Sequence, residues 1–246
     1  MLAAFIFFTR LPFWKIAEVP ADAFRHVVCR WPLVGWLTAA LSVLVLYSSA
    51  LVLPASVALL LAILTRLLVT GCLHEDGLAD FFDGFGGGTS RERTLEIMKD
   101  SHIGSYGVIG LIFYFALYYA MLHALPLPVA GAVMLAGDPF SKGVAAMIIN
   151  RLPYARTAET AKNKTVYSQM SLSEYLFCIL SALIPLVWLP DVSYLWALLF
   201  PVITWYLLTS FMKRKINGYT GDCCGATFLL CELSFYLGSL LVYQMK

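Results

Sequence analysis

Residues 55–84 decide the class of this chain, and their sequence is ASVALLLAILTRLLVTGCLHEDGLADFFDG. The first part, Ala55 to Leu73, is apolar and has about the 20 residues that a helix needs to cross the hydrocarbon core of a membrane. The second part, His74 to Gly84, is rich in carboxylates and follows without a linker. The rest of the chain is therefore interpreted in relation to a membrane span that ends in an acidic motif.

Three aspartates of the acidic motif share one side of a helix. Asp76, Asp80 and Asp83 are spaced i, i+4 and i+7, which places them on one face. Like charges so close together repel each other unless a cation lies between them. Ligand sets made only of oxygen favour a hard divalent ion, most often Mg²⁺, in sites that handle phosphates. We therefore expect these aspartates to bind Mg²⁺; a solvated acidic loop is the plainer alternative.

The overall composition places the chain in a membrane. Hydrophobic residues make up 60% of it and charged residues 13%, with a mean hydropathy of +0.78, whereas soluble proteins have about 25% charged residues. The net charge is only +2, and no basic stripe interleaved with aromatic residues indicates nucleic acid as a partner. The expected surroundings are the lipid bilayer.

Seven apolar runs predict an all-α fold, because each is long enough, or nearly so, to cross a membrane as a helix. We expect a polytopic integral membrane helical bundle that forms a single domain over residues 1–246. The segment before the first span, Met1 to Trp14, is expected to lie at the membrane interface. The expected spans are Trp31 to Leu53, Ala55 to Leu73, Tyr106 to Leu125, Val129 to Asn150, Tyr175 to Leu189, Tyr194 to Met212 and Ala226 to Met245.

Two of the expected spans are irregular. Gly137-Asp138-Pro139 and Lys142 interrupt the fourth span, and proline and charge at that depth favour a broken or kinked helix that lines a polar cavity. The fifth span is short and contains Pro185, so it either tilts, kinks or fails to cross.

The basic residues predict how the bundle is oriented. With the N-terminus in the cytoplasm, fourteen Lys and Arg residues fall on the cytoplasmic side and only Lys246 on the other, which is a strong positive-inside signal. We therefore expect a multi-pass protein of the bacterial cytoplasmic (inner) membrane. The fourteen are Arg10, Lys15, Arg25, Arg30, Arg91, Arg93, Lys99, Arg151, Arg156, Lys162, Lys164, Lys213, Arg214 and Lys215.

This orientation also puts the polar motifs on the cytoplasmic face. In the loop after the fourth span, Arg151, Arg156, Lys162 and Lys164 could hold phosphates or bind anionic lipid. Asp222, which follows a Thr-Gly turn, could bind metal or cap the last helix. A transporter would place its polar residues at mid-membrane in both halves of a repeat, and no repeat is seen. An enzyme with a cytoplasmic substrate fits better.

The chain carries several distinctive motifs: Thr9 to Pro12, His74 to Asp80 with Asp83-Gly84, Arg91 to Arg93, Glu96 to Val108, Leu152 to Arg156, Tyr219 to Asp222, Gly225-Ala226 and Glu232. Together they resemble the cobalamin synthase family, the adenosylcobinamide-GDP ribazoletransferases, and the resemblance covers essentially the whole chain. Glu75 stands where a hydrophobic residue is usual in that family, and Asn217 stands where a glycine is common. Neither departure removes a carboxylate from the pattern.

The resemblance implies a reaction in which α-ribazole, or its 5'-phosphate, is joined to adenosylcobinamide-GDP with release of GMP, late in cobalamin biosynthesis. It implies Mg²⁺ as the cofactor, held by Asp76, Asp80, Asp83 and Asp222. Asp76, Asp80 and Asp222 would be catalytic, with Asp222 a further ligand or the base for the attacking hydroxyl. The residues expected to bind substrate are His74, Lys99, Asp100, His102, Arg151, Arg156, Asn217, Thr220 and Glu232.

Two other functions are weighed against this one. A CDP-alcohol phosphotransferase also sets aspartates at helical spacing beside the membrane, but its pattern has arginine soon after Asp-Gly, where this chain has Asp80. A cation transporter could use the aspartates as its ion pathway. An apolar chain with one polar face is compatible with a monomer or a homo-oligomer, and the sequence does not choose between them.

Overall fold

The computed structural model describes residues 1–156 and 166–246 and confirms the all-α class. Among these described residues no strand forms, and the β contact is a single parallel bridge that joins Tyr154 to Tyr219. The α-helices are α1 (Leu2–Phe8), α2 (Trp31–Ala50), α3 (Ala55–Thr70), α4 (Leu73–Gly87), α5 (Arg91–Ile97), α6 (Ser105–His123), α7 (Leu127–Ala146), α8 (Ile148–Arg151), α9 (Leu172–Leu183), α10 (Leu199–Ile216) and α11 (Gly221–Gln244). The 3-10 helices are η1 (Phe13–Lys15), η2 (Ala21–His26), η3 (Val28–Arg30), η4 (Ile184–Trp188) and η5 (Val192–Leu198).

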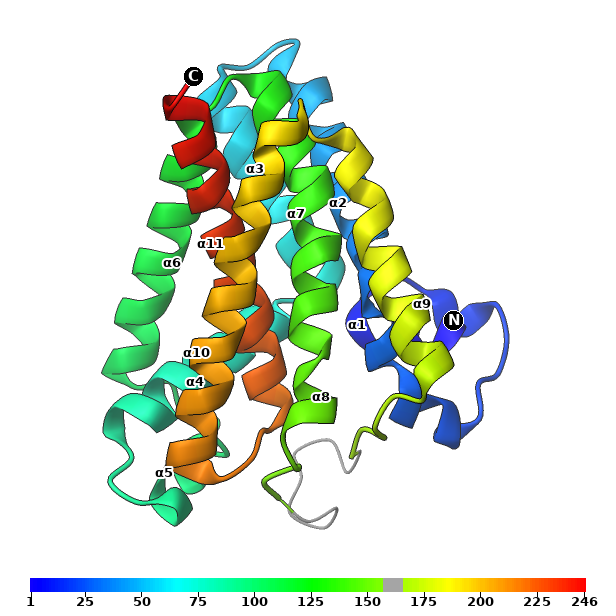
Figure 1. Ribbon diagram of the computed structural model, residues 1–246, viewed down its shortest axis with the longest axis vertical. Helices are drawn as coiled ribbons and strands as arrows, with labels where there is room; N and C mark the ends of the chain where they lie inside the picture. The colour runs from blue at the N-terminus through cyan, green and yellow to red at the C-terminus, as the bar shows by residue number, and fades with distance from the viewer. Residues whose placement is uncertain (157–165) are drawn as a thin grey trace.

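The seven expected spans all correspond to helical segments, but they differ in length. Within the described ranges, five helices are long and apolar enough to cross a membrane, and a bent pair made of α3 and α4 brings the number to six. The fifth expected span is the shorter apolar helix Leu172–Trp188, consistent with its predicted irregularity. In Figure 1 the long helices run along the vertical axis, and α4, α5 and α8 lie at one end of the bundle.

A sharp corner between α3 and α4 turns the acidic motif across the end of the bundle. The two helices are bent by 90°. Gly71 has a φ of 64° and Cys72 a φ of 58°. Two consecutive residues in the left-handed conformation end a right-handed helix and turn the chain in a new direction. The backbone N–H of Arg10 also donates to the Val69 carbonyl at 2.7 Å. The expected second span thus leads into the acidic motif through a fixed corner.

The fourth span was expected to be broken or kinked, and the structure shows no break at Pro139. Helix α7 is continuous, with Pro139 inside it. Asp138 pairs with Lys142 one turn further along, and the Thr38 hydroxyl of α2 donates to the other Asp138 oxygen at 2.6 Å. The charges therefore satisfy each other inside the bundle, and no polar cavity is needed to solvate them. The break in the bundle lies between α3 and α4 instead.

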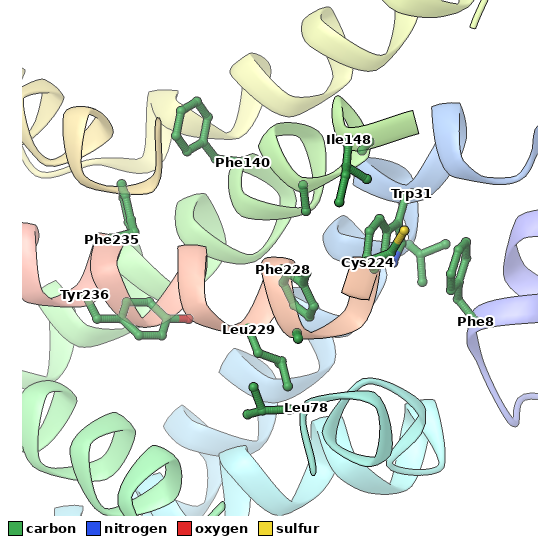
Figure 2. Packing of buried hydrophobic residues seen from close by; sticks show 14 of the residues in the cluster. Phe8, Trp31, Leu78, Phe140, Ile148, Cys224, Phe228, Leu229, Phe235 and Tyr236 are labelled. Carbon is green, nitrogen blue, oxygen red and sulfur yellow. The ribbon is translucent and has the colours of Figure 1, made fainter. Parts of the chain in front are cut away.

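Helix α11 forms the centre of the bundle, where α4 and α7 pack against it. Figure 2 shows Leu229 of α11 and Leu78 of α4 pointing toward one another, and both are buried. At the end where α11 begins, Trp31 lies between Phe8 and Phe228 in the same view. This packing sets the position of the first turns of α4 and α11, where the polar motifs are found.

Candidate active site

A cavity of about 120 Å³ lies at the end of the bundle where α4 and α11 begin. Two motifs far apart in the sequence, the acidic motif and the Thr-Gly-Asp turn, both contribute to its walls. The cavity has a polar side and an aromatic side. Its lining residues are Phe7, Phe8, Val28, Trp31, Leu73, His74, Asp76, Tyr154, Arg156, Tyr167, Thr220, Gly221, Asp222, Cys224 and Gly225.

The close approach of α4 and α11 brings Asp76 and Asp222 to this cavity. A methyl group on Gly77 would lie 3.0 Å from the Asp222 Cα, and one on Gly225 would lie 3.3 Å from the His74 Cα. Such contacts are tighter than nine in ten real Cβ contacts, so a Cβ at either position would push the two backbones apart, and glycine favours their close approach. Two glycines therefore position the two aspartates.

Thr220, rather than Asp222, caps α11. The Thr220 hydroxyl oxygen accepts from the backbone N–H of Cys223 at 3.3 Å, the usual geometry of a helix N-cap. Asp222 stands in the first turn of α11, where a carboxylate is favoured by the helix dipole. Asp222 is therefore not the capping residue of α11. Thr220 lines the cavity and also caps this helix.

The segment before residue 157 is tied to the Thr-Gly-Asp turn. The Tyr219 N–H donates to the Pro153 carbonyl at 3.0 Å, and the Ala155 N–H donates to the Tyr219 carbonyl at 2.8 Å. Arg156 then lines the cavity and donates through Nη2 to the Leu95 carbonyl at 2.8 Å. These bonds hold a cationic side chain in the same cavity as the two aspartates.

Tyr154 adds a neutral donor to the cavity. Burial raises the pKa of Tyr154 to about 12, and the nearby Cys224 and Asp222 act in the same direction. The phenol therefore stays protonated over the physiological pH range. It can donate a hydrogen bond to an anionic group that enters the cavity, and it cannot act as a base there.

Asp83 was expected to bind metal, and the structure corrects this. Its Oδ2 accepts from the Gly104 N–H at 2.7 Å and its Oδ1 from the Gly107 N–H at 2.8 Å. Gly104 is the N-cap residue of α6, and the N–H groups of a first helical turn have no partners inside the helix. Asp83 is buried and supplies those partners. Asp80, one turn before it, is half-buried.

Lys99, Asp100 and His102 lie together, but away from the cavity of Asp76 and Asp222. They line a separate, open recess between α5 and α6 that Asp83 also reaches. The His102 ring lies 2.7 Å from Asp100, and its hydrogen bonds lower the pKa of that carboxyl. They were expected to bind substrate, and the structure places them in a recess that Asp76 and Asp222 do not line.

Arg151 and Asn217 also have other roles than expected. The Arg151 guanidinium lies 5.0 Å from the ring centroids of both Trp205 and Tyr206 on α10, and Arg151 is not among the cavity residues. Asn217 ends α10 with a φ of 51°, a conformation that glycine adopts most easily. This agrees with glycine being common at this position in the family that the motifs resemble. Lys162 and Lys164 lie outside the described residues.

Glu232 was expected to bind substrate, but it lies inside the bundle. It pairs with Arg66 of α3 and accepts from the Tyr236 hydroxyl at 2.8 Å. Arg66 also reaches Glu75 at 3.3 Å and the Tyr114 hydroxyl at 2.7 Å. Arg66 and Glu232 are both almost fully buried. Arg66, Glu75 and Glu232, with Tyr114 and Tyr236, therefore form a charged core that joins α3, α4, α6 and α11.

Comparison with known proteins identifies the family. A sequence model described as cobalamin-5-phosphate synthase matches residues 1–240. The chain belongs to the cobalamin-5-phosphate synthase family. It is 40% identical over 244 residues to an adenosylcobinamide-GDP ribazoletransferase of Shewanella sp. (strain W3-18-1), which covers 98% of this chain and 93% of that protein. No solved structure matches this chain.

A second relative shows the same extent of similarity. The adenosylcobinamide-GDP ribazoletransferase of Shewanella oneidensis is 39% identical over 239 residues, covering 96% of this chain and 91% of that protein. The resemblance to the family that the motifs predicted is thereby confirmed over nearly the whole length. The two motifs that meet at the cavity are among those on which the resemblance was based.

The structure adds residues to the site of this family member that the sequence did not single out. Trp31, Phe8 and Tyr167 line the cavity beside Asp76 and Asp222. Trp31 is the first residue of a membrane span, where aromatic residues are common at the lipid interface, so nothing in its position pointed to the site. Tyr154 belongs to the Leu152 to Arg156 motif, which was the one available signal.

The side chains of the described residues form no complete metal site by themselves. Among residues 1–156 and 166–246, no group of three or more His, Cys, Asp or Glu side chains is placed to hold a metal ion. Asp76 and Asp222 share a cavity wall, and Asp80 follows Asp76 by one helical turn. A metal at this cavity would need further ligands from its substrate or from water.

Proposed function

We propose that the protein is an adenosylcobinamide-GDP ribazoletransferase that joins α-ribazole, or its 5'-phosphate, to adenosylcobinamide-GDP and releases GMP. The observation that carries this proposal is the convergence of Asp76, Asp222 and Arg156 on one cavity. They come from three family motifs, and they combine anionic groups for a metal or a proton with a cation for a phosphate. The family and its relatives act late in cobalamin biosynthesis, and we assign this chain to the same step.

The reaction is a phosphoryl-type transfer between two oxygens. A ribose hydroxyl of α-ribazole attacks the phosphorus next to the corrinoid, and the bond from this phosphorus to the bridging oxygen of the diphosphate breaks. GMP leaves with the electron pair of that bond. Asp222 accepts the hydroxyl proton, and Arg156 compensates charge on the phosphate oxygens. The Tyr154 hydroxyl, which remains protonated, donates to an oxygen of the same group.

Mg²⁺ is the proposed cofactor. The donor set fits it, because Mg²⁺ is usually held by one or two carboxylates together with substrate phosphates and water, and Asp76 and Asp222 offer two carboxylates on one cavity. Asp80, one helical turn further along α4, would hold a water of the ion. When bound, Mg²⁺ neutralises phosphate oxygens and stabilises the leaving group.

We also propose that the cavity faces the cytoplasm from the bacterial inner membrane. The turns that lack Lys and Arg lie at the opposite end of the bundle from α4, α5 and α8, as Figure 1 shows for the α2–α3 and α6–α7 connections. Single cysteines at Gly87 and Leu127, in a background without other exposed cysteines, test this with a membrane-impermeant reagent. Gly87→Cys is expected to react only from the cytoplasmic side and Leu127→Cys only from outside; the reverse pattern contradicts the orientation.

Purified protein in detergent tests the reaction itself. With Mg²⁺, α-ribazole and adenosylcobinamide-GDP, we expect GMP and the corrinoid product in equal amounts. A CDP-alcohol with a free alcohol is the control pair, and no CMP should form from it. Release of CMP, or no release of GMP from the corrinoid substrate, contradicts the proposed function. Electrogenic cation flux in proteoliposomes without turnover would favour a transporter.

A further inference from the structure

One wall of the cavity is built from aromatic rings that come from three separate helices. The ring of Phe8 on α1 stacks on Trp31 of α2 with centroids 5.1 Å apart, and the Trp31 ring lies 5.5 Å from His74 of α4. All three residues line the cavity. Figure 2 shows Phe8 and Trp31 side by side at the beginning of α11. This side of the cavity is aromatic, whereas Asp76, Asp222 and Arg156 form its charged side.

Two of these side chains are buried without a hydrogen-bond partner. Trp31 is 1% exposed and His74 is 2% exposed. Neither the Trp31 Nε1 nor either His74 ring nitrogen has a partner in the part of the chain that the structure describes. A buried polar group without a partner destabilises a fold, and buried polar groups in native proteins nearly always find one. Both side chains border the cavity, so a bound molecule can supply what the protein does not.

The size of the cavity limits which molecule this is. A protein cavity of about 150 Å³ admits a single benzene ring, and this one measures about 120 Å³. It is therefore no larger than the space that holds one aromatic ring, which excludes a corrin macrocycle and requires the rest of a larger occupant to extend out of the cavity. The occupant has a flat aromatic part against Trp31 and a polar part near Asp76 and Asp222. A nucleoside has this combination of parts.

We propose that the aromatic base of α-ribazole binds against Trp31 and His74, with the Trp31 N–H donating to the free ring nitrogen of the base. The inference rests on the proposed function. A benzimidazole base has one ring nitrogen bound to ribose and one free acceptor, which a single indole N–H can satisfy. The ribose then extends toward Asp222, where its hydroxyl is activated. Guanine, the other base in the reaction, is joined to the attacked phosphorus through the ribose and phosphate of the leaving GMP, so it would lie further from Asp222 than the base of the attacking nucleoside.

The test compares how variants affect the two substrates separately. Trp31→Phe keeps an aromatic ring and removes the N–H, and His74→Phe does the same for the imidazole nitrogens. For Trp31→Phe we expect the KM for α-ribazole to rise about tenfold, because one hydrogen bond is lost. The KM for adenosylcobinamide-GDP should stay within about twofold of wild type. A rise in the KM for adenosylcobinamide-GDP alone would assign the aromatic wall to guanine and overturn the proposal. No change in either KM would also overturn it.

Trp205→Phe is the matched control. The Trp205 Nε1 is also buried without a partner among the described residues, but Trp205 lies against Arg151 and not at the cavity. Its substitution should leave the KM for α-ribazole unchanged. An equal rise in KM for Trp31→Phe and Trp205→Phe would indicate a general loss of structure and contradict a specific contact.

A modified substrate keeps the proposal testable even if the Trp31 variant does not fold. An indole riboside, in which carbon replaces the free ring nitrogen, has the same shape as the benzimidazole riboside without the acceptor. Wild-type protein should use it with a kcat/KM about tenfold lower, and Trp31→Phe should no longer distinguish the two nucleosides. Equal use of both by the wild type overturns the inference alone. Failure of the wild type to release GMP with α-ribazole instead refutes the proposed function on which the inference rests.

Discussion

Glu75 and Asp76 are neighbours on α4, and they belong to two regions with opposite characters. Glu75 points into the bundle, where Arg66 reaches it at 3.3 Å, and it is buried, whereas Asp76 is exposed on the wall of the cavity. Helix α11 repeats the contrast, with Asp222 at the cavity and Glu232 paired to Arg66. Both helices therefore carry one carboxylate for the charged core and one for the candidate active site.

The difference lies in what satisfies each charge. Ionisable groups within the hydrocarbon region are costly unless they pair with one another, and Arg66 and Lys142 meet Glu75, Glu232 and Asp138 within the protein. Those carboxylates are already committed to cations that stabilise the fold. Asp76 and Asp222 border a space that a ligand can enter. Glu75, Glu232 and Asp138 thus build the bundle, whereas Asp76 and Asp222 line the candidate active site.

Removal of divalent metal should have the largest effect on the cavity and none on the charged core. With EDTA we expect GMP release to fall to background and to return when Mg²⁺ is added, because two carboxylates and a diphosphate in one cavity carry more negative charge than Arg156 alone can offset. The thermal unfolding temperature should change little, since the core uses Arg66 and Lys142 as its cations. Full turnover in metal-free buffer would remove the metal from the proposal.

Substitution of the two neighbouring carboxylates should separate chemistry from stability. Asp76→Asn keeps the size of the side chain, and we expect turnover to drop about a thousandfold, which corresponds to roughly 4 kcal/mol of transition-state stabilisation. Glu75→Gln should lower the unfolding temperature while turnover per folded molecule stays within about fivefold. GMP release and thermal unfolding on the same preparations measure both. A slower reaction for Glu75→Gln than for Asp76→Asn would reverse the assignment of the two regions.

Loss of the central cation should destabilise the core strongly. Arg66→Met leaves Glu75 and Glu232 buried without their shared partner, and breaking a buried pair from one side typically costs about 3–5 kcal/mol. We expect poor recovery of folded protein and a much lower unfolding temperature in detergent. The triple variant Arg66→Met, Glu75→Gln, Glu232→Gln should regain part of this stability, because no unpaired charge remains. Wild-type stability of Arg66→Met would show that the pairs contribute nothing.

Two arginines in the same connecting region should differ by a smaller margin. Arg156 lines the cavity, whereas Arg151 stacks on Trp205 and Tyr206. We expect Arg156→Ala to lower kcat/KM for adenosylcobinamide-GDP by about 30-fold, as for loss of a charged phosphate contact. Arg151→Ala should stay within about threefold of wild type. Equal losses in the steady-state rates of the two variants would place both guanidinium groups on the phosphates.

The sequence predicted the class and the helices well, because both follow from local properties. Apolar runs of sufficient length identify spans without knowledge of their neighbours, and six of the seven expected spans are matched by the long helices and the α3–α4 pair. The continuity of α7 could not be foreseen, since it depends on Thr38 of another helix meeting Asp138. A proline and charged residues within an apolar run do not show whether a neighbouring helix supplies a side chain that pairs with the charge.

The candidate site was predicted only in part for a similar reason. Helical spacing put Asp83 on the same face as Asp76, but the donors that occupy Asp83 come from the start of α6. Glu232 and Asp222 belong to one motif region, yet the partner that separates their roles is Arg66 on α3. Trp31 carries no signal in the sequence at all. Residue type and spacing indicate candidate site residues. The hydrogen-bond and ion-pair partners that distant segments supply decide which of the candidates line the cavity.

A double-variant cycle on Asp76 and Asp222 tests most directly whether the two motifs form one site. Asp76→Asn, Asp222→Asn and the combined variant are compared with wild type by the single-turnover rate of GMP release at saturating Mg²⁺ and substrates. Residues that act as a unit give losses that do not multiply. The double variant should therefore be no more than about threefold slower than the slower single variant. If the two losses multiply, Asp76 and Asp222 act independently, and the cavity that joins them is not the active site.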